Sequence, residues 1–231
     1  MCGICGYHFQ DTARRVDAKI IYRMNAALTH RGPDDVGVWV NNHIAFGARR
    51  LSIQDVPHGH QPMVNEDKTW AVAFNGELYN VRALRGALRQ LGFSFNTHCD
   101  TEVVLRAYEA YGEAAVDHFN GMFSIAVYNA REDSLLLVRD RLGVKPLYYT
   151  VANGTLAFAS ELDALVRSGL ITGTLNPGAL DAYFQFLYVP APDSIYENVH
   201  KVRPGEFLRW RKGILTKTQY WQPEYAIDDT W

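Results

Sequence analysis

Short apolar runs recur along the first 160 residues, and most of them are bounded by Gly, Asn, Asp or Pro. Aliphatic and aromatic residues dominate these runs, which is typical of β-strands. The last four runs are joined by connections too short for a parallel crossover, so we expect antiparallel pairing there. The predicted strands are residues 2–9, 36–40, 43–48, 71–74, 122–128, 134–139, 147–151 and 155–160.

A different periodicity interrupts the strands. Apolar residues spaced three or four apart predict a helix that includes Ile20 and Leu28, and two more over roughly 79–91 and 101–112. A fourth helix is expected to begin near Pro177, because proline suits a first helical turn. Helices placed between antiparallel strands predict an α+β fold in which sheet layers are covered by helices.

Proline and glycine recur at short intervals after residue 170, in the stretches TGTLNPG, YVPAPDS and RPGE. This composition is typical of turns and loops. We therefore interpret the region as a connector that follows the compact part of the chain.

The composition narrows the class of protein without indicating its chemistry. The 231 residues are 48% hydrophobic and 21% charged, with a net charge of −2, so nothing marks a nucleic-acid or anionic-membrane surface. No apolar stretch approaches the roughly 18–20 residues of a membrane helix, and the N-terminus lacks a signal-peptide profile. Three cysteines make no disulfide framework. We expect a cytoplasmic protein with neither nucleic-acid nor membrane partners.

Cys2 is the residue that is most informative about a possible reaction. If Met1 is removed, one residue carries both a thiol and an α-amine. An α-amine titrates near about 7.7–8, so a useful fraction of it accepts a proton at neutral pH. A thiol next to its own base is an activated nucleophile. The alternative is an ordinary cysteine, because with Met1 attached the Cys2 nitrogen is an amide and not a base.

Cys2 and Cys5 also form a C-x-x-C pair, which raises a redox or metal-binding alternative. A redox pair of this spacing normally opens a helix, whereas here a strand pattern follows. Zinc needs two more ligands, and the available residues lack paired spacing. Those residues are His58, His60, His98 and Cys99. We interpret Cys5 as a core residue and expect no metal in this chain.

Asn75 and Gly76 follow the apolar run AVAF, and two interpretations stay open. Asn-Gly after a strand is commonly a tight turn, since both residues tolerate positive φ. An Asn amide and the next backbone N–H are also a suitable donor pair for a developing oxyanion. Glycine at the second position lets a substrate approach the backbone closely.

Arg50 and Asp100 are charges on either side of that motif. The Arg fork suits a carboxylate and the Asp suits an ammonium group, so together they can grip a free α-amino acid. Taken singly, each is more often a solvated surface charge. The local sequence of HRGPD at 30–34 indicates only a helix stop, and residues 139–146 indicate a polar turn between two strands.

Five motifs occur in order: MCGI at the start, HRGPD at 30–34, RLSI at 50–53, NGE at 75–77 and RDRLGVKPLYY at 139–149. Together they resemble the N-terminal glutaminase domain of glutamine-dependent asparagine synthetases, which are class II glutamine amidotransferases. The resemblance implies a four-layer αββα sandwich of two antiparallel sheets, of the N-terminal-nucleophile hydrolase type. It implies an amidotransferase domain over residues 1–210 and the start of a connector over 211–231.

The resemblance also implies roles for individual residues. Cys2 is the expected nucleophile, with its freed amine as base, and Asn75 with Gly76 is the expected oxyanion hole. Arg50 is expected to hold the α-carboxylate of glutamine. The backbone of Leu51, Ser52 and Ile53 is expected to line the pocket, and Glu77 and Asp100 to bind near the α-ammonium group.

The implied reaction is glutamine hydrolysis to glutamate and ammonia through a Cys2 thioester. The ammonia is expected to serve ATP-dependent asparagine synthesis in a C-terminal synthetase domain or subunit. No phosphate-cradling motif occurs in these 231 residues, so we expect no cofactor here, and ATP and Mg²⁺ only in that synthetase part. Another ammonia acceptor, or a non-catalytic glutamine-binding or docking module, is the alternative. We also expect that the chain can form a homodimer.

Overall fold

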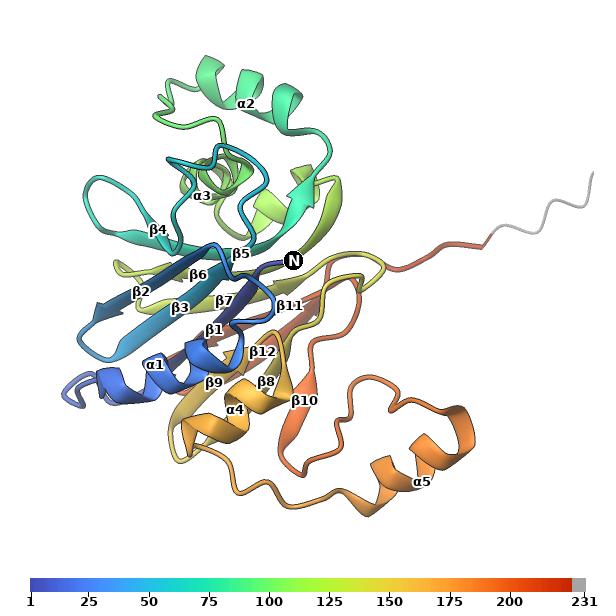
Figure 1. The fold of residues 1–231 in the computed structure, drawn as a ribbon. Helices are drawn as coiled ribbons and strands as arrows, with labels where there is room; N and C mark the ends of the chain where they lie inside the picture. The colour runs from blue at the N-terminus through green and yellow to red at the C-terminus, as the bar shows by residue number, and fades with distance from the viewer. Residues whose placement is uncertain (226–231) are drawn as a thin grey trace, which may run out of the picture.

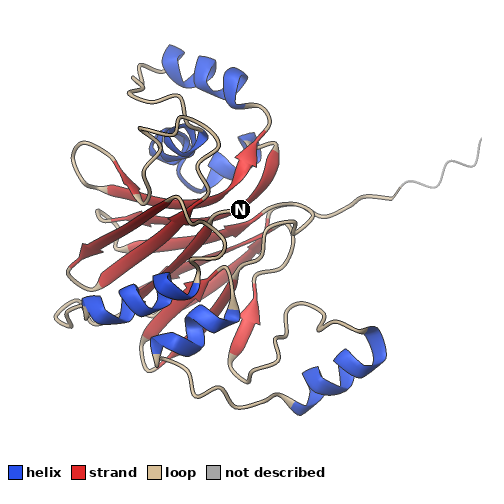
Figure 2. Ribbon diagram, in the orientation of Figure 1, coloured by secondary structure: helices blue, strands red, loops and turns tan. Residues whose placement is uncertain are grey.

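The computed structural model describes residues 1–225, which form two six-stranded antiparallel sheets with helices on their outer faces (Figures 1 and 2). The strands are β1 (Gly3–Phe9), β2 (Asp35–Asn41), β3 (Ile44–Arg50), β4 (Met63–Val64), β5 (Trp70–Leu78), β6 (Gly121–Asn129), β7 (Ser134–Arg139), β8 (Tyr148–Ala152), β9 (Thr155–Ala159), β10 (Val199–Lys201), β11 (Glu206–Arg211) and β12 (Ile214–Gln219). The helices are α1 (Ala18–Ala27), α2 (Val81–Gln90), α3 (Asp100–Tyr111), the 3₁₀ helix η1 (Gly112–His118), α4 (Leu162–Ser168) and α5 (Pro177–Phe186).

The first sheet has the order β10-β8-β9-β1-β3-β2 and the second the order β12-β11-β7-β6-β5-β4. Apolar side chains form three successive layers. One lies between α1, α4 and the first sheet, one between the two sheets, and one between the second sheet and α2 with α3. This is the predicted four-layer αββα sandwich.

The central strands read as unbroken apolar runs because both of their faces are buried. In β5, Val72 and Phe74 pack toward the helices, while Ala71 and Ala73 pack between the sheets. In β1, Gly6 meets the ring of Phe158 so closely that a Cβ would lie 2.6 Å from it. The predicted strands and the four predicted helices are confirmed. Their apolar residues are adjacent or closely spaced in the sequence, so the pattern of each element could be recognised without knowledge of the rest of the fold.

The connector expected after residue 170 is wrong for residues 199–219. β10 pairs with β8, β11 pairs with β7, and β12 pairs with β11, so these segments extend both sheets. Trp210 of β11 is 2% exposed and packs between the sheets. The boundary drawn at residue 210 falls inside β11, and residues 226–231 of the expected connector lie outside the described residues.

Helix α5 projects away from the sandwich (Figure 1). Asn176 caps its start by accepting N–H bonds from Gly178 and Ala179, and Pro177 occupies the first turn as predicted. No helix of residues 1–225 has both the length and the apolar character needed to cross a membrane.

Trp210→Ala tests whether the late strands belong to the folded domain. The change removes a large buried ring from between the sheets, so we expect the free energy of unfolding to fall by about 3–5 kcal/mol. Urea denaturation measures the loss. Ile214→Ala in β12, at a side chain 65% exposed, is the matched control and should change stability by roughly 0.5 kcal/mol or less. Equal, small effects of both changes would contradict the integral role of β11.

Candidate active site

Hydrogen bonds to the backbone at and just after Cys2 hold this residue in place. It directly precedes β1, and the neighbouring Ile4 exchanges two bonds with Ser160, N–H to Oγ at 3.0 Å and O from N–H at 2.8 Å. The Cys2 carbonyl accepts a 2.9 Å bond from Nε of Arg31. Arg31 in turn pairs with Glu161 at 2.7 Å. The backbone from Cys2 to Ile4 is therefore anchored to Arg31 and to Ser160, which follows β9 of the first sheet.

The HRGPD motif does more than end a helix. Besides the Arg31 bond to Cys2, a Cβ on Gly32 would lie 2.4 Å from the backbone of Arg49 and Arg50, so only glycine fits there. The carboxylate of Asp34 accepts the Ser52 N–H at 2.8 Å. The motif thus joins Cys2 to the segment that follows β3, a role that the local pattern did not indicate.

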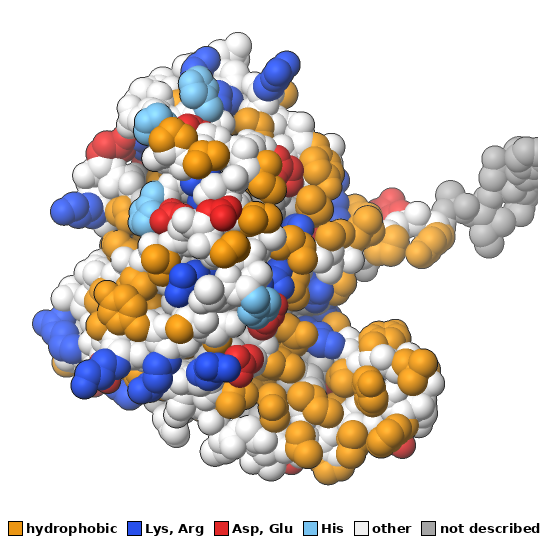
Figure 3. All heavy atoms as spheres, viewed as in Figure 1, with side chains coloured by type: hydrophobic (Ala, Val, Ile, Leu, Met, Phe, Trp, Pro, Cys, Tyr) orange, Lys and Arg blue, Asp and Glu red, His pale blue; other side chains and the backbone are white. Residues whose placement is uncertain are grey.

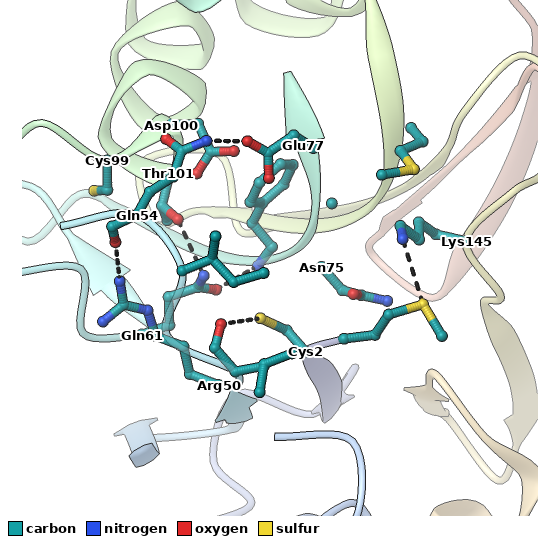
Figure 4. Close-up of a pocket in the computed structure, with 16 residues that line it drawn as sticks. Cys2, Arg50, Gln54, Gln61, Asn75, Glu77, Cys99, Asp100, Thr101 and Lys145 are labelled. Carbon is teal, nitrogen blue, oxygen red and sulfur yellow. Dashed lines mark hydrogen bonds between the residues drawn. The ribbon is translucent and has the colours of Figure 1, made fainter. Parts of the chain in front are cut away.

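Cys2 lies on the wall of a cavity of about 190 Å³ (Figure 4). That is smaller than the ~300–1,000 Å³ of sites for drug-sized ligands, so the cavity suits a small metabolite. Every residue predicted for the site lines it except Ser52. The full lining is Met1, Cys2, Arg50, Leu51, Ile53, Gln54, Gln61, Phe74, Asn75, Gly76, Glu77, Cys99, Asp100, Thr101, Met122 and Lys145.

Asn75 and Gly76 lie inside β5, opposite Ser124 and Phe123 of β6, so the tight-turn interpretation is wrong. A Cβ on Gly76 would lie 2.4 Å from the carbonyl oxygen of Met122, which means that the close strand pairing requires glycine. The Asn75 side chain is 1% exposed, and its Nδ2 makes only a long 3.4 Å bond to Ser124. Its amide keeps donor capacity for a group in the cavity.

Arg50 lies in the wall of the cavity, and most of its guanidinium N–H groups are hydrogen-bonded to backbone carbonyls. It donates to the carbonyls of Val56 at 3.0 Å and Asp55 at 3.2 Å, and closely to that of Gln54. These bonds hold the loop after β3 against the cavity. They use three of the five N–H groups, which leaves Nε and one Nη1 hydrogen for another acceptor.

Two carboxylates, those of Glu77 and Asp100, line the same cavity as Arg50. Glu77 accepts a bond from the Gln54 amide (Figure 4). Asp100 begins α3, is 7% exposed, and its Oδ2 is buried without a hydrogen-bond partner among residues 1–225. Burial, with the nearby Glu77 charge, raises the pKa of Asp100 to about 6. A buried, unpaired carboxylate of this kind is matched by a cationic ligand group.

Burial dominates the acidity of the Cys2 thiol and raises its pKa. The Arg50 charge favours the thiolate, while Asp100 opposes it. The Sγ atom lies 3.9 Å from the Leu51 carbonyl oxygen. With Met1 attached, the thiol is therefore held in its protonated form, and forming the thiolate needs a base close to it.

Cys5 is confirmed as a core residue. It lies on the opposite face of β1 from the inter-sheet layer, completely buried against α1, where burial strongly raises its pKa. Both Cys2 and Cys5 are free thiols. The C-x-x-C pair is thus divided between the cavity and the core.

Sequence reasoning missed several lining residues. Gln61 accepts the Phe74 N–H at 2.8 Å and donates to Thr101 Oγ at 3.0 Å, which ties the loop after β3 to β5 and α3. No local pattern marks these residues. Lys145, in contrast, belongs to the motif RDRLGVKP, which could have marked it. The buried Asp140 carboxylate accepts the backbone N–H of Lys145 at 2.9 Å and so holds the loop that brings Lys145 to the cavity.

Comparisons with known proteins agree with this arrangement. Two Bacillus subtilis (strain 168) relatives are similar along the chain: "Asparagine synthetase [glutamine-hydrolyzing] 1" is 40% identical over 97% of this chain, and "Asparagine synthetase [glutamine-hydrolyzing] 3" is 36% identical over 100% of it. The matched regions cover 36% and 39% of those relatives, so the chain spans less than half their length.

The fold matches a solved structure of glutamine phosphoribosylpyrophosphate amidotransferase from B. subtilis, complexed with ADP and GMP. The TM-score is 0.72 over 96% of this chain and 50% of that one, at 18% identity, a likeness of fold alone. It agrees with the predicted α+β sandwich of two antiparallel sheets. A family model described as "Glutamine amidotransferase domain" matches residues 1–221. With the cavity at Cys2, this match shows that the chain belongs to the glutamine amidotransferase domain family.

Proposed function

We propose that this chain hydrolyses the side-chain amide of glutamine to glutamate and ammonia, with Cys2 as nucleophile. The observation that carries the proposal is the joint placement of a thiol at the start of β1 and an unpaired buried carboxylate, Asp100, in one small cavity. Such a cavity offers a reactive group at one position and a matched site for an ammonium group at another. Glutamine presents an amide and an α-ammonium group in that way.

The first half-reaction forms a thioester. Once Met1 is removed, the α-amine of Cys2 takes the thiol proton, and Sγ attacks the amide carbon of glutamine. The oxyanion that develops accepts bonds from Asn75 Nδ2 and the Gly76 N–H. The protonated amine then gives its proton to the leaving nitrogen, so ammonia departs and a glutamyl thioester remains. The raised pKa of the thiol supports the need for a base within the same residue.

The second half-reaction releases glutamate. The same amine takes a proton from water, which attacks the thioester, and the returning proton restores the thiol. The substrate is held at its α-carbon end: the α-carboxylate binds the remaining N–H groups of Arg50, and the α-ammonium binds Asp100 and Glu77. Leu51 and Ile53 also line the cavity beside the substrate.

We further propose that the ammonia passes to a synthetase domain that uses ATP and Mg²⁺ to make asparagine from aspartate. The relatives named above support this, since each continues well beyond the matched region. The apolar surface around α5 supports a covering partner (Figure 3). Phe184 is 72% and Leu187 is 80% exposed there, and large exposed apolar patches commonly mark interfaces.

Labelling with 6-diazo-5-oxo-norleucine, an electrophilic glutamine mimic, tests the nucleophile. We expect an intact mass that lacks Met1 and gains one adduct, which peptide mapping places on Cys2. Cys2→Ala should abolish both the adduct and glutamate release. Cys5→Ala, at a thiol buried away from the cavity, is the matched control and should keep both. Undiminished glutamate release by Cys2→Ala would refute the mechanism.

Asp100→Asn tests the ammonium site. The change removes a charged partner of the substrate, so kcat/KM for glutamine should fall by roughly 30-fold or more, mainly through KM. Because it also removes an unpaired buried charge, the free energy of unfolding without substrate should stay equal or rise. Steady-state kinetics and urea denaturation measure the two effects. Asp163→Asn, an exposed residue of α4, is the control; a stability loss in Asp100→Asn with unchanged KM would contradict the role.

The pKa of Asp100 gives a pH prediction for binding. Its value near 6 lies above the ordinary carboxyl value, so the folded protein without ligand holds the proton more tightly, and the carboxylate form is lost as pH falls through 6. Glutamine affinity, measured by calorimetry in Cys2→Ala, should therefore decline below pH 6 by up to about tenfold per unit. Asp100→Asn in the same background should bind weakly at every pH from 5 to 8. An equally steep decline in that variant would exclude Asp100 as the cause.

A further inference from the structure

Four polar side chains meet at the end of the sandwich away from Cys2. His8 near the end of β1 and His43 in the turn between β2 and β3 each place Nε2 against Oδ1 of Asp133, at 3.0 and 2.7 Å. Tyr128 of β6 donates to the same oxygen at 2.9 Å. His8 lies six residues along β1 from Cys2, roughly 20 Å at about 3.3 Å per residue, so the cluster is separate from the cavity.

As a hydrogen-bond network this arrangement is poorly satisfied. Oδ1 of Asp133 faces three donors with about two lone-pair sites. Donation from both Nε2 atoms also fixes both imidazoles in one tautomer. Their Nδ1 atoms are then bare acceptors, and both are buried without a partner among residues 1–225. The crowding of three donors on one carboxylate oxygen is the feature that calls for another explanation.

We propose that His8, His43 and Asp133 form a binding site for one divalent transition-metal ion, with zinc as the best match. Two imidazole nitrogens and one carboxylate oxygen are a donor set that zinc takes, with a fourth position left for water. A cation accepts electron pairs from all three atoms at once, which relieves the crowding of donors on Oδ1. This departs from the expectation of no metal in the chain.

The geometry is close to what coordination needs. The three ligand atoms lie within 4.8 Å of one another. Zinc bonds of about 2.0–2.2 Å in a tetrahedron separate ligand atoms by about 3.4 Å, so the two N···O distances need to widen by less than an ångström. Asp133 lies in the turn between β6 and β7 and its side chain is 30% exposed, which gives the ion an entry path and the ligand room to move.

Neighbouring groups favour the ion. The Tyr128 hydroxyl donates to the Asp133 carboxylate at 2.9 Å and orients it. His8 lies in β1 and His43 in the β2–β3 turn of the first sheet, whereas Asp133 lies in the β6–β7 turn of the second, so a bound ion ties the two sheets together. The role is structural and leaves the chemistry at Cys2 untouched.

The test is a titration of the whole chain with Co²⁺ and Zn²⁺, after Cys2 has been blocked by 6-diazo-5-oxo-norleucine. Blocking removes the Cys2 thiol as a competing ligand, and blocked and unblocked samples are compared. We expect one ion per chain by calorimetry and a cobalt absorption spectrum without a thiolate band. At a zinc concentration near 100 Kd, the melting temperature should rise by roughly 5–10 °C.

Asp133→Asn and His43→Gln should each remove the binding and the shift in melting temperature, whereas His118→Gln, an exposed histidine outside the cluster, should keep both. Far-UV circular dichroism checks that the variants are folded, and the wild-type spectrum tests the proposal even where a variant does not fold. Absence of binding to the wild-type chain, a thiolate-type cobalt spectrum, or binding that survives in both folded variants would overturn it.

Discussion

The position of β1 governs the rest of the structure. β1 pairs with β9 on one edge and β3 on the other, and both of its faces are covered. A strand enclosed on four sides has no freedom to slide, because a one-residue slip would move every side chain to the opposite face. Cys2 is the residue immediately before it, so the register of the sheet fixes where the thiol emerges. The bond from Arg31 to the Cys2 carbonyl completes the anchoring.

The cavity next to Cys2 is built at the cost of local stability. Among residues 1–225, Oδ2 of Asp100 is buried without a hydrogen-bond partner, and Nδ2 of Asn75 has only a long bond to Ser124. Each of these features leaves a polar group for a partner that the protein itself does not supply. The surrounding layers compensate, since α3 and β5 are otherwise packed in continuous apolar contact. A binding site for a polar small molecule requires polar groups that are already positioned by a rigid surrounding structure.

Features with a local cause could be predicted from the sequence, and features with a distant cause could not. The buried strands and α1, α2 and α3 carry their periodicity in adjacent residues. β12 was missed because it is an edge strand with mostly exposed residues and no apolar alternation. Of the two interpretations of Gly76, the tight turn is wrong, because the real constraint is the Met122 carbonyl on the next strand. The predicted site residues other than Ser52 lie around one cavity, but Gln61 and the cluster at Asp133 depend on contacts between distant segments that no short pattern encodes.

The bond between Ile4 and Ser160 spans 156 residues and has a consequence for how the protein is made. Cys2 is synthesised well before β9, yet the pairing of β1, the strand that follows Cys2, is complete only when β9 has been synthesised and has paired with it. Contacts of such long range form late and slowly in folding. During translation the thiol is therefore an exposed, unpositioned group for most of the synthesis of the domain. The residue proposed as the nucleophile is therefore positioned only after most of the domain has been synthesised.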